Sequence, residues 1–217
     1  MQAKRIPSLV LAGAALCSVG ADAASADAGR LPDAEVFASN TTAVITDPAD
    51  PRLDARLARF KRDVHRIIRR GGGLPRDSQL VDGVFFSTIL GFTTFQRSRE
   101  FDVDGVSRRE LRAIADRVRR RYHQQSVLTF DYPERRSDSI DAIEVEVPGI
   151  SAQDLRDGFQ ADAEARTRLG GGSVTLDGRL ILIASLEDFA LVERFVGVIG
   201  GDFRQATIRG GRREFVG

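Results

Sequence analysis

Four carboxylates lie close together midway along the chain, and closely spaced carboxylate oxygens are the ligands that calcium prefers. Glu100, Asp102 and Asp104 alternate along the chain, and Glu110 follows after a glycine. A calcium loop would need one more residue after that glycine to bring the last glutamate into its bidentate position. A helix start explains the same residues, because Ser107 and Glu110 have the spacing of a capping box. We therefore predict a turn and a capped helix here, and no metal site or cofactor.

Nucleophilic catalysis has one set of candidates. His123 and Ser126 follow a predicted helix, and Glu100 would complete a polar site with them. A histidine in contact with a serine hydroxyl can act as its general base. The alternative role of His123 is at the helix C-terminus, where an imidazolium complements the helix dipole. The enzyme hypothesis therefore requires Glu100, His123 and Ser126 to converge. The chain has no Walker loop, G-x-S-x-G or H-E-x-x-H motif that would indicate another chemistry.

Charge divides the chain unevenly. Residues 29–136 carry a net charge of +6 and residues 137–217 carry −5, while the whole chain has +1. The excess of bases falls on two predicted helical stretches, 52–70 and 107–123. If these helices lie side by side, their outer faces form a basic patch. The arginines of this patch are Arg56, Arg59, Arg62, Arg66, Arg108, Arg112 and Arg120.

The basic patch has three explanations. It is a solvated helix face, a surface that binds an anionic envelope polymer or an acidic protein, or a surface that the acidic second half neutralises. Nucleic acid is disfavoured as a partner, because the mature chain is nearly neutral and its arginines are not interleaved with aromatic residues.

The elements that position these residues follow the same order in each half of the chain. Amphipathic spacing, capping residues and turn glycines predict strand, helix, two strands, helix and strand, twice over. In the first half these are 43–45, 51–70, a hairpin across 84–103, 108–122 and 127–132. In the second half they are 143–147, 151–169, 174–176, 180–184, 187–199 and 206–209, followed by a short hairpin with 214–216.

This order is that of the ferredoxin-like fold, in which two helices cover one face of a four-stranded antiparallel sheet. We therefore predict an α+β protein of two tandem ferredoxin-like (βαββαβ) units with antiparallel sheets. A basic unit at 42–133 and an acidic unit at 142–217 would be joined by a linker at 134–141. The units would share one sheet or pack sheet to sheet, since a unit of about 80 residues has only a modest core. The alternative is a single α+β domain in which the repeated order is a coincidence.

The first 28 residues have the features of a signal peptide. Lys4 and Arg5 precede an apolar run, and small residues with cleavage-site spacing follow it. The run is too short for a convincing membrane span, so we expect a secreted, extracytoplasmic protein with no membrane span in the mature chain. Residues 29–41 are small and polar, and we expect a flexible lead-in there. Cleavage would remove Cys17, the only cysteine, and leave a mature protein free of disulfides.

The end of the second predicted helix and the strand after it resemble a known family. The segment reads Tyr122-His123-Gln124-Gln125-Ser126-Val127-Leu128. It is similar to the ending aromatic-x-Gln-Glu-Ser-Val-Leu of a small secreted bacterial domain family of unknown function. The resemblance covers the first half of the chain only. It implies export and the order of elements in that half, and it implies no activity.

Three functions follow from the sequence as hypotheses. We favour a secreted, non-catalytic binding or structural protein that engages an anionic partner through the Arg-rich helical face. A protease-inhibitor or propeptide-like module is the first alternative, by analogy at the level of fold. An enzyme with a polar site near Glu100, His123 and Ser126 is the second alternative.

Overall fold

Eight strands and five α-helices build the described part of the protein, residues 33–133 and 139–217 of a computed structural model. The strands are β1 (Ala34–Ala38), β2 (Leu74–Ser87), β3 (Phe92–Asp104), β4 (Val127–Asp131), β5 (Ala142–Pro148), β6 (Gly171–Thr175), β7 (Arg179–Ser185) and β8 (Thr207–Val216). The α-helices are α1 (Ala58–Arg70), α2 (Arg108–Tyr122), α3 (Ala152–Ala161), α4 (Ala163–Arg168) and α5 (Phe189–Val198). Three 3-10 helices accompany them: η1 (Pro51–Asp54), η2 (Leu186–Asp188) and η3 (Phe203–Gln205).

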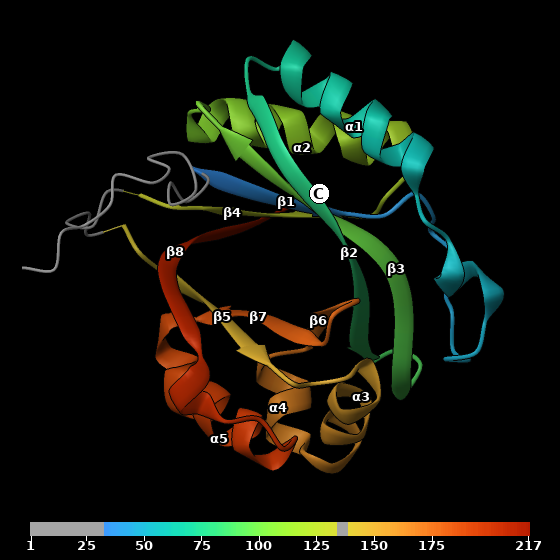
Figure 1. The fold of residues 1–217 in the computed structure, drawn as a ribbon, viewed down its shortest axis with the longest axis vertical. Coiled ribbons are helices and arrows are strands. Elements are labelled where there is room, and N and C mark those ends of the chain that lie inside the picture. The colour runs from blue at the N-terminus through green and yellow to red at the C-terminus, as the bar shows by residue number, and fades with distance from the viewer. Residues whose placement is uncertain (1–32, 134–138) are drawn as a thin grey trace, which may run out of the picture. The chain divides into compact units, whose positions relative to one another are not determined.

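The strands close one antiparallel barrel in the order β1-β3-β2-β6-β7-β5-β8-β4 (Figure 1). The prediction of two tandem ferredoxin-like (βαββαβ) units with antiparallel sheets is therefore wrong. The four strands of each half are neighbours, but β2 pairs with β6 and β4 pairs with β8. These two pairings join the halves along both edges, so each of the eight described strands has a neighbouring strand on both sides.

Strand β8 carries one of these joins. Its first residues, from Thr207 to Gly211, pair with β5, and its last residues, from Arg212 to Val216, pair with β4. The predicted short hairpin between 206–209 and 214–216 is wrong, because β8 runs through Gly210 and Gly211 without a break. Gly211 is required there, since a Cβ atom at this position would clash with the ring of Phe130.

Two groups of helices cover the outside of the barrel. Helices α1 and α2 lie together on one side, and α3, α4 and α5 lie on the other (Figure 1). Strand residues such as Val36 and Phe101 pack under the first group, and Val145 and Leu182 pack under the second. Each such fully buried side chain stabilises the fold by about 1.5–3 kcal/mol. Because side chains alternate along a strand, the next residues must point into the barrel.

The sequence predicts the caps and turns better than the lengths of elements. The capping box of Ser107 and Glu110 is confirmed, as are the hairpin across 84–103 and the pair of strands at 174–176 and 180–184. The predicted helix over 51–70 is instead η1 followed by α1, because Leu57 adopts a left-handed conformation between them. The predicted helix over 151–169 is α3 and α4, and Asp162 separates them and caps α4.

The first strand of the barrel lies where the sequence predicts a lead-in. Residues 34–38 form β1, whereas the predicted strand at 43–45 contributes only an isolated bridge between Ile45 and Phe95. The predicted signal peptide at 1–28 lies outside the described residues, as do residues 134–138 of the predicted linker. No helix in the described ranges is long and apolar enough to cross a membrane.

Candidate functional site: two cavities inside the barrel

The inward-facing side chains of β1 and β3 differ between the two ends of the strand. On β3 the neutral Gln96 and Ser98 are followed by the acids Glu100 and Asp102. On β1, which is antiparallel to β3, the acid Glu35 comes first and Phe37 comes after it. The interior accordingly contains two cavities at different levels of the strands. We call them the apolar cavity, of about 510 Å³, and the acidic cavity, of about 200 Å³.

The apolar cavity is lined by hydrophobic side chains and by neutral polar groups, and by a single cation. Its larger hydrophobic residues are Phe37, Val81, Phe85, Phe86, Leu128, Leu169, Ile181, Ile183 and Phe215. Its polar side chains are Ser39, Gln96, Ser98, Gln124, Gln125, Ser126, Ser173 and Arg213. No aspartate or glutamate lines it in the described part of the chain.

Arg213 is the charged group of the apolar cavity. Its Nη2 atom donates a hydrogen bond of 2.6 Å to the Ser185 hydroxyl. It makes no ion pair with any carboxylate of residues 33–133 or 139–217. Arg179 and Arg209, which line the acidic cavity, pair with glutamates. Arg213, by contrast, offers a guanidinium group without a carboxylate partner.

Phe85 forms part of the wall because two neighbouring positions are glycine. A Cβ atom on Gly83 or on Gly171 would clash with the Phe85 ring. Gly171 is the second of three consecutive glycines, 170–172, that follow α4. Gly170 adopts a left-handed φ of 72° after the helix, and Gly171 leaves room for the Phe85 ring.

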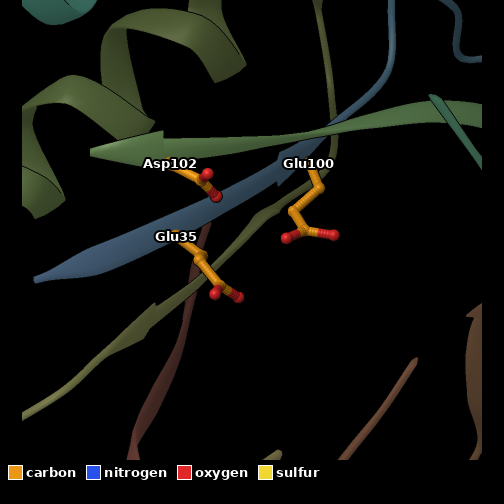
Figure 2. A group of neighbouring side chains, drawn as sticks. All are labelled: Glu35, Glu100 and Asp102. Carbon is orange, nitrogen blue, oxygen red and sulfur yellow. The ribbon is translucent and has the colours of Figure 1, made fainter. Parts of the chain in front are cut away.

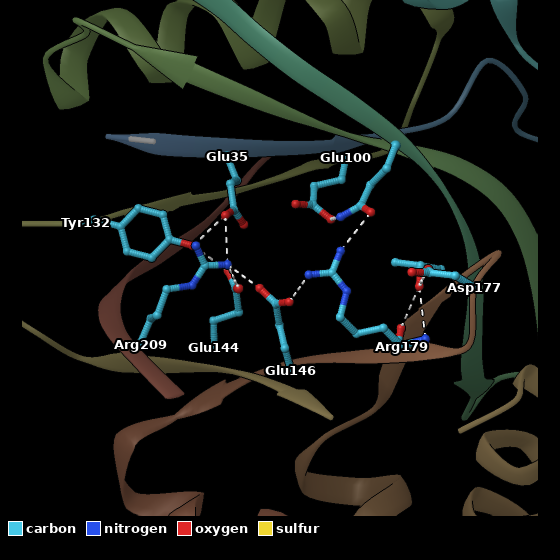
Figure 3. A network of polar contacts seen from close by, with 10 residues as sticks. Glu35, Glu100, Tyr132, Glu144, Glu146, Asp177, Arg179 and Arg209 are labelled. Atoms are coloured by element: carbon cyan, nitrogen blue, oxygen red, sulfur yellow. Dashed lines mark hydrogen bonds and ion pairs between the residues drawn. The ribbon is translucent and has the colours of Figure 1, made fainter. Parts of the chain in front are cut away.

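The acidic cavity is built around a shared arginine and a tyrosine (Figure 3). The Tyr132 hydroxyl lies 2.5 Å from Glu35 Oε1 and 2.7 Å from Glu144 Oε2. A phenol has one proton to donate, so the carboxylates of Glu35 and Glu144 compete for the same hydroxyl. Arg209 contacts Glu35 at 3.2 Å and Glu146 at 2.5 Å, and it also pairs with Glu144.

Burial raises the pKa values of four carboxyl groups of this cavity. Burial, followed by the charges of Glu144 and Glu100, raises the pKa of Glu35 well above its usual value. Burial, followed by Glu144 and Asp102, raises the pKa of Glu100 to about 8. The pKa values of Asp102 and Glu146 are also raised, again with burial as the largest cause.

The structure does not bring the predicted enzyme residues together. Glu100 lines the acidic cavity, and Ser126 lies at the apolar cavity. His123 lines neither cavity. It is exposed and forms the C-cap of α2 with a left-handed φ of 54°, which agrees with the alternative role at the helix end.

The predicted basic patch lies on α1 and α2 and on the residues before α1. Its seven arginines, Arg56, Arg59, Arg62, Arg66, Arg108, Arg112 and Arg120, are exposed. Four of them contact carboxylates: Arg66 pairs with Asp63, Arg120 with Asp116, and Arg108 and Arg112 with Glu214. The other three have no ion pair in the described ranges.

Several residues of the two cavities were not identified from the sequence. They are Glu35, Tyr132, Glu144, Glu146, Arg179, Arg209 and Arg213. Glu144 and Glu146 alternate with apolar residues in β5, which is a detectable sign of a strand with one polar face. Glu35 lies in a segment without this sign, because the small and polar residues of 29–41 predict a flexible lead-in and no strand.

Neither the family models nor the curated proteins nor the solved structures include a match to this chain. The similarity of residues 122–128 to a secreted domain family therefore stays a resemblance, and function must be argued from the cavities themselves.

Proposed function

We propose that the protein binds a small amphipathic anion, such as an aliphatic or aromatic carboxylate, in the apolar cavity. The observation that carries this proposal is the single unpaired arginine, Arg213, in an apolar wall without acids. Guanidinium groups bind carboxylates through two parallel hydrogen bonds, and an apolar wall favours the hydrocarbon part of the same molecule. The volume of about 510 Å³ lies in the range of small-molecule sites.

Binding is favoured over catalysis by the residue types of the wall. The described lining residues include no carboxylate, histidine or cysteine, so they supply no ordinary general base or strong nucleophile. Serine and glutamine side chains there would orient a ligand by hydrogen bonds.

A dye-displacement assay tests the proposal. The purified protein would be saturated with 1-anilinonaphthalene-8-sulfonate, an apolar anion, and titrated with decanoate, decanol or decylamine. We expect decanoate to displace the dye at the lowest concentration. Arg213→Gln should weaken decanoate binding about tenfold or more, because a hydrogen-bonded ion pair contributes about 1.5–3 kcal/mol.

The matched control is Arg59→Gln, which removes an unpaired arginine from the outer surface. It should leave decanoate binding unchanged. Equal displacement by decanoate and decylamine, or an equal effect of the two substitutions, would show that Arg213 does not select an anion.

A second candidate function concerns the outer surface and is supported by a different observation. Arg56, Arg59 and Arg62 are exposed and lack carboxylate partners in the described ranges. They would bind an anionic polymer or an acidic protein through long-range attraction. Binding to immobilised heparin should weaken steeply with added salt and should be reduced in a triple Arg→Gln variant of these positions. Binding that is absent, or that does not depend on salt, contradicts this function.

A further inference from the structure

Three carboxylates meet at one point of the acidic cavity. Glu35 extends from β1, and Glu100 and Asp102 extend from the neighbouring strand β3 (Figure 2). Each offers one oxygen, and these oxygens lie within 4.8 Å of one another. Calcium–oxygen distances of about 2.3–2.6 Å place ligands up to about 5 Å apart across one ion. The three oxygens therefore fit within one coordination shell.

The arginines of the cavity leave these three carboxylates with little compensation. Arg209 divides its contacts among Glu35, Glu144 and Glu146, and Arg179 pairs with Glu146. Glu100 has only the neutral amide of Gln79, which donates at 2.8 Å. The carboxylate of Asp102 makes no hydrogen bond or ion pair with any residue in the described ranges.

One oxygen of the cluster is buried without a partner. Glu35 is 1% exposed, and its Oε2 atom has no hydrogen-bond partner although its Oε1 atom contacts Tyr132. A buried acceptor without a partner costs about 1–3 kcal/mol, and more when it is charged. A bound cation would satisfy this oxygen, and the same cation would offset the charges of Glu100 and Asp102.

We propose that Glu35, Glu100 and Asp102 bind one divalent cation of the oxygen-preferring class to which Ca²⁺, Mg²⁺ and Mn²⁺ belong. The three ligands are all carboxylates, and no histidine or cysteine lines the acidic cavity in the described ranges, which disfavours softer metals. Water would complete the coordination. The site is independent of the proposed anion binding, and it departs from the sequence prediction of no metal.

Calorimetric titration of the chelator-treated, purified full chain with each chloride salt tests the site. We expect saturable binding of one ion per chain and an increase in the melting temperature with the ion that binds best. Glu35→Gln and Asp102→Asn should each weaken binding by at least about tenfold. Removing a residue that only supports a metal ligand already costs about tenfold or more in affinity, and these two substitutions remove ligands themselves. Asp77→Asn is the matched control, because Asp77 lines the same cavity outside the trio.

Terbium luminescence locates the ion without a change to the ligands. The chain has two tyrosines and no tryptophan, and Tyr132 contacts Glu35 while Tyr122 lies on α2. Tb³⁺ bound to the trio should therefore be sensitised by tyrosine excitation. Tyr132→Phe should abolish the signal and Tyr122→Phe should preserve it, even if Glu35→Gln does not fold.

Three results would overturn the proposal. The first is the absence of saturable binding of all three ions in the wild-type protein, which would mean that protons alone neutralise the trio. The second is an equal loss of affinity in Asp77→Asn and in the ligand variants, which would mean a diffuse attraction. The third is a terbium signal that depends on Tyr122.

Discussion

Glu100 lies inside the barrel with a neutral amide as its hydrogen-bond partner. Its pKa is about 8 in the folded protein and near 4.5 in an exposed glutamate. Between these pH values the folded protein retains a proton that the unfolded chain has released. The free energy of unfolding therefore falls as the pH rises through this window, by up to about 1.4 kcal/mol per pH unit.

Glu100→Gln should reduce this dependence on pH, because an amide cannot release the proton. We expect the variant to be more stable than the wild type at pH 8 and to lose this advantage at pH 5. Urea unfolding at both pH values, in the presence of a chelator, measures the difference. Glu187→Gln, at an exposed position, is the control and should keep the wild-type slope. A wild-type slope in Glu100→Gln would contradict the assignment, because another buried carboxyl group of the cavity, Glu35, Asp102 or Glu146, would then titrate in its place.

At the scale of elements, β8 depends on a glycine where it passes from β5 to β4. The Phe130 ring occupies the space of a side chain at Gly211. Gly211→Ala should therefore destabilise the protein by about 1–3 kcal/mol, the usual cost of overpacking. Chemical denaturation measures this loss, and far-UV circular dichroism would check that the fold is kept.

Helix α5 offers the opposite case as a control. Gly197 is an exposed position within the helix, and no atom lies within 4 Å of where its Cβ would be. Gly197→Ala should stabilise the protein by about 0.5–1 kcal/mol, because alanine loses less backbone entropy in a helix. If Gly211→Ala and Gly197→Ala changed the free energy of unfolding by the same amount, the packing of Phe130 against β8 would not explain the loss of stability in Gly211→Ala.

For the whole described barrel, closure predicts that the two halves unfold together. Each half shares strand pairs with the other along both edges, through β2 with β6 and β4 with β8. Separating the halves would expose four strand edges and open both cavities. Native-state hydrogen exchange should therefore give similar opening free energies for β1, β3, β5 and β7. Two separate unfolding transitions, one for each half, would contradict this prediction.

Part of the candidate site could be predicted from the sequence. The sequence identified Glu100 as a candidate site residue. It also placed Gln125 and Ser126 just after a helix, and both line the apolar cavity. Their partners were not found. Glu35, Arg209 and Arg213 come from distant strands, and nothing in the residues around them indicates which face of which strand they occupy.

The sequence by itself determined the local structure. Apolar residues at helical spacing predicted the buried face of α2, and Ser107 with Glu110 predicted its start, because these interactions join residues three or four apart. Alternation of acidic and apolar residues likewise predicted β5, and the turn signal Asp177-Gly178 predicted the hairpin of β6 and β7. These patterns also predicted the repeated order of elements, which the structure retains.

Only the tertiary structure decided how the strand edges meet. Pairing β2 with β6 brings together residues more than 80 positions apart, and hydrogen bonds between strand backbones carry almost no information about residue type. Closure turned what would have been the open faces of two sheets into one interior. Acids that would be solvated on an open sheet are thereby buried together, and this burial changes their pKa values and creates the candidate cation site.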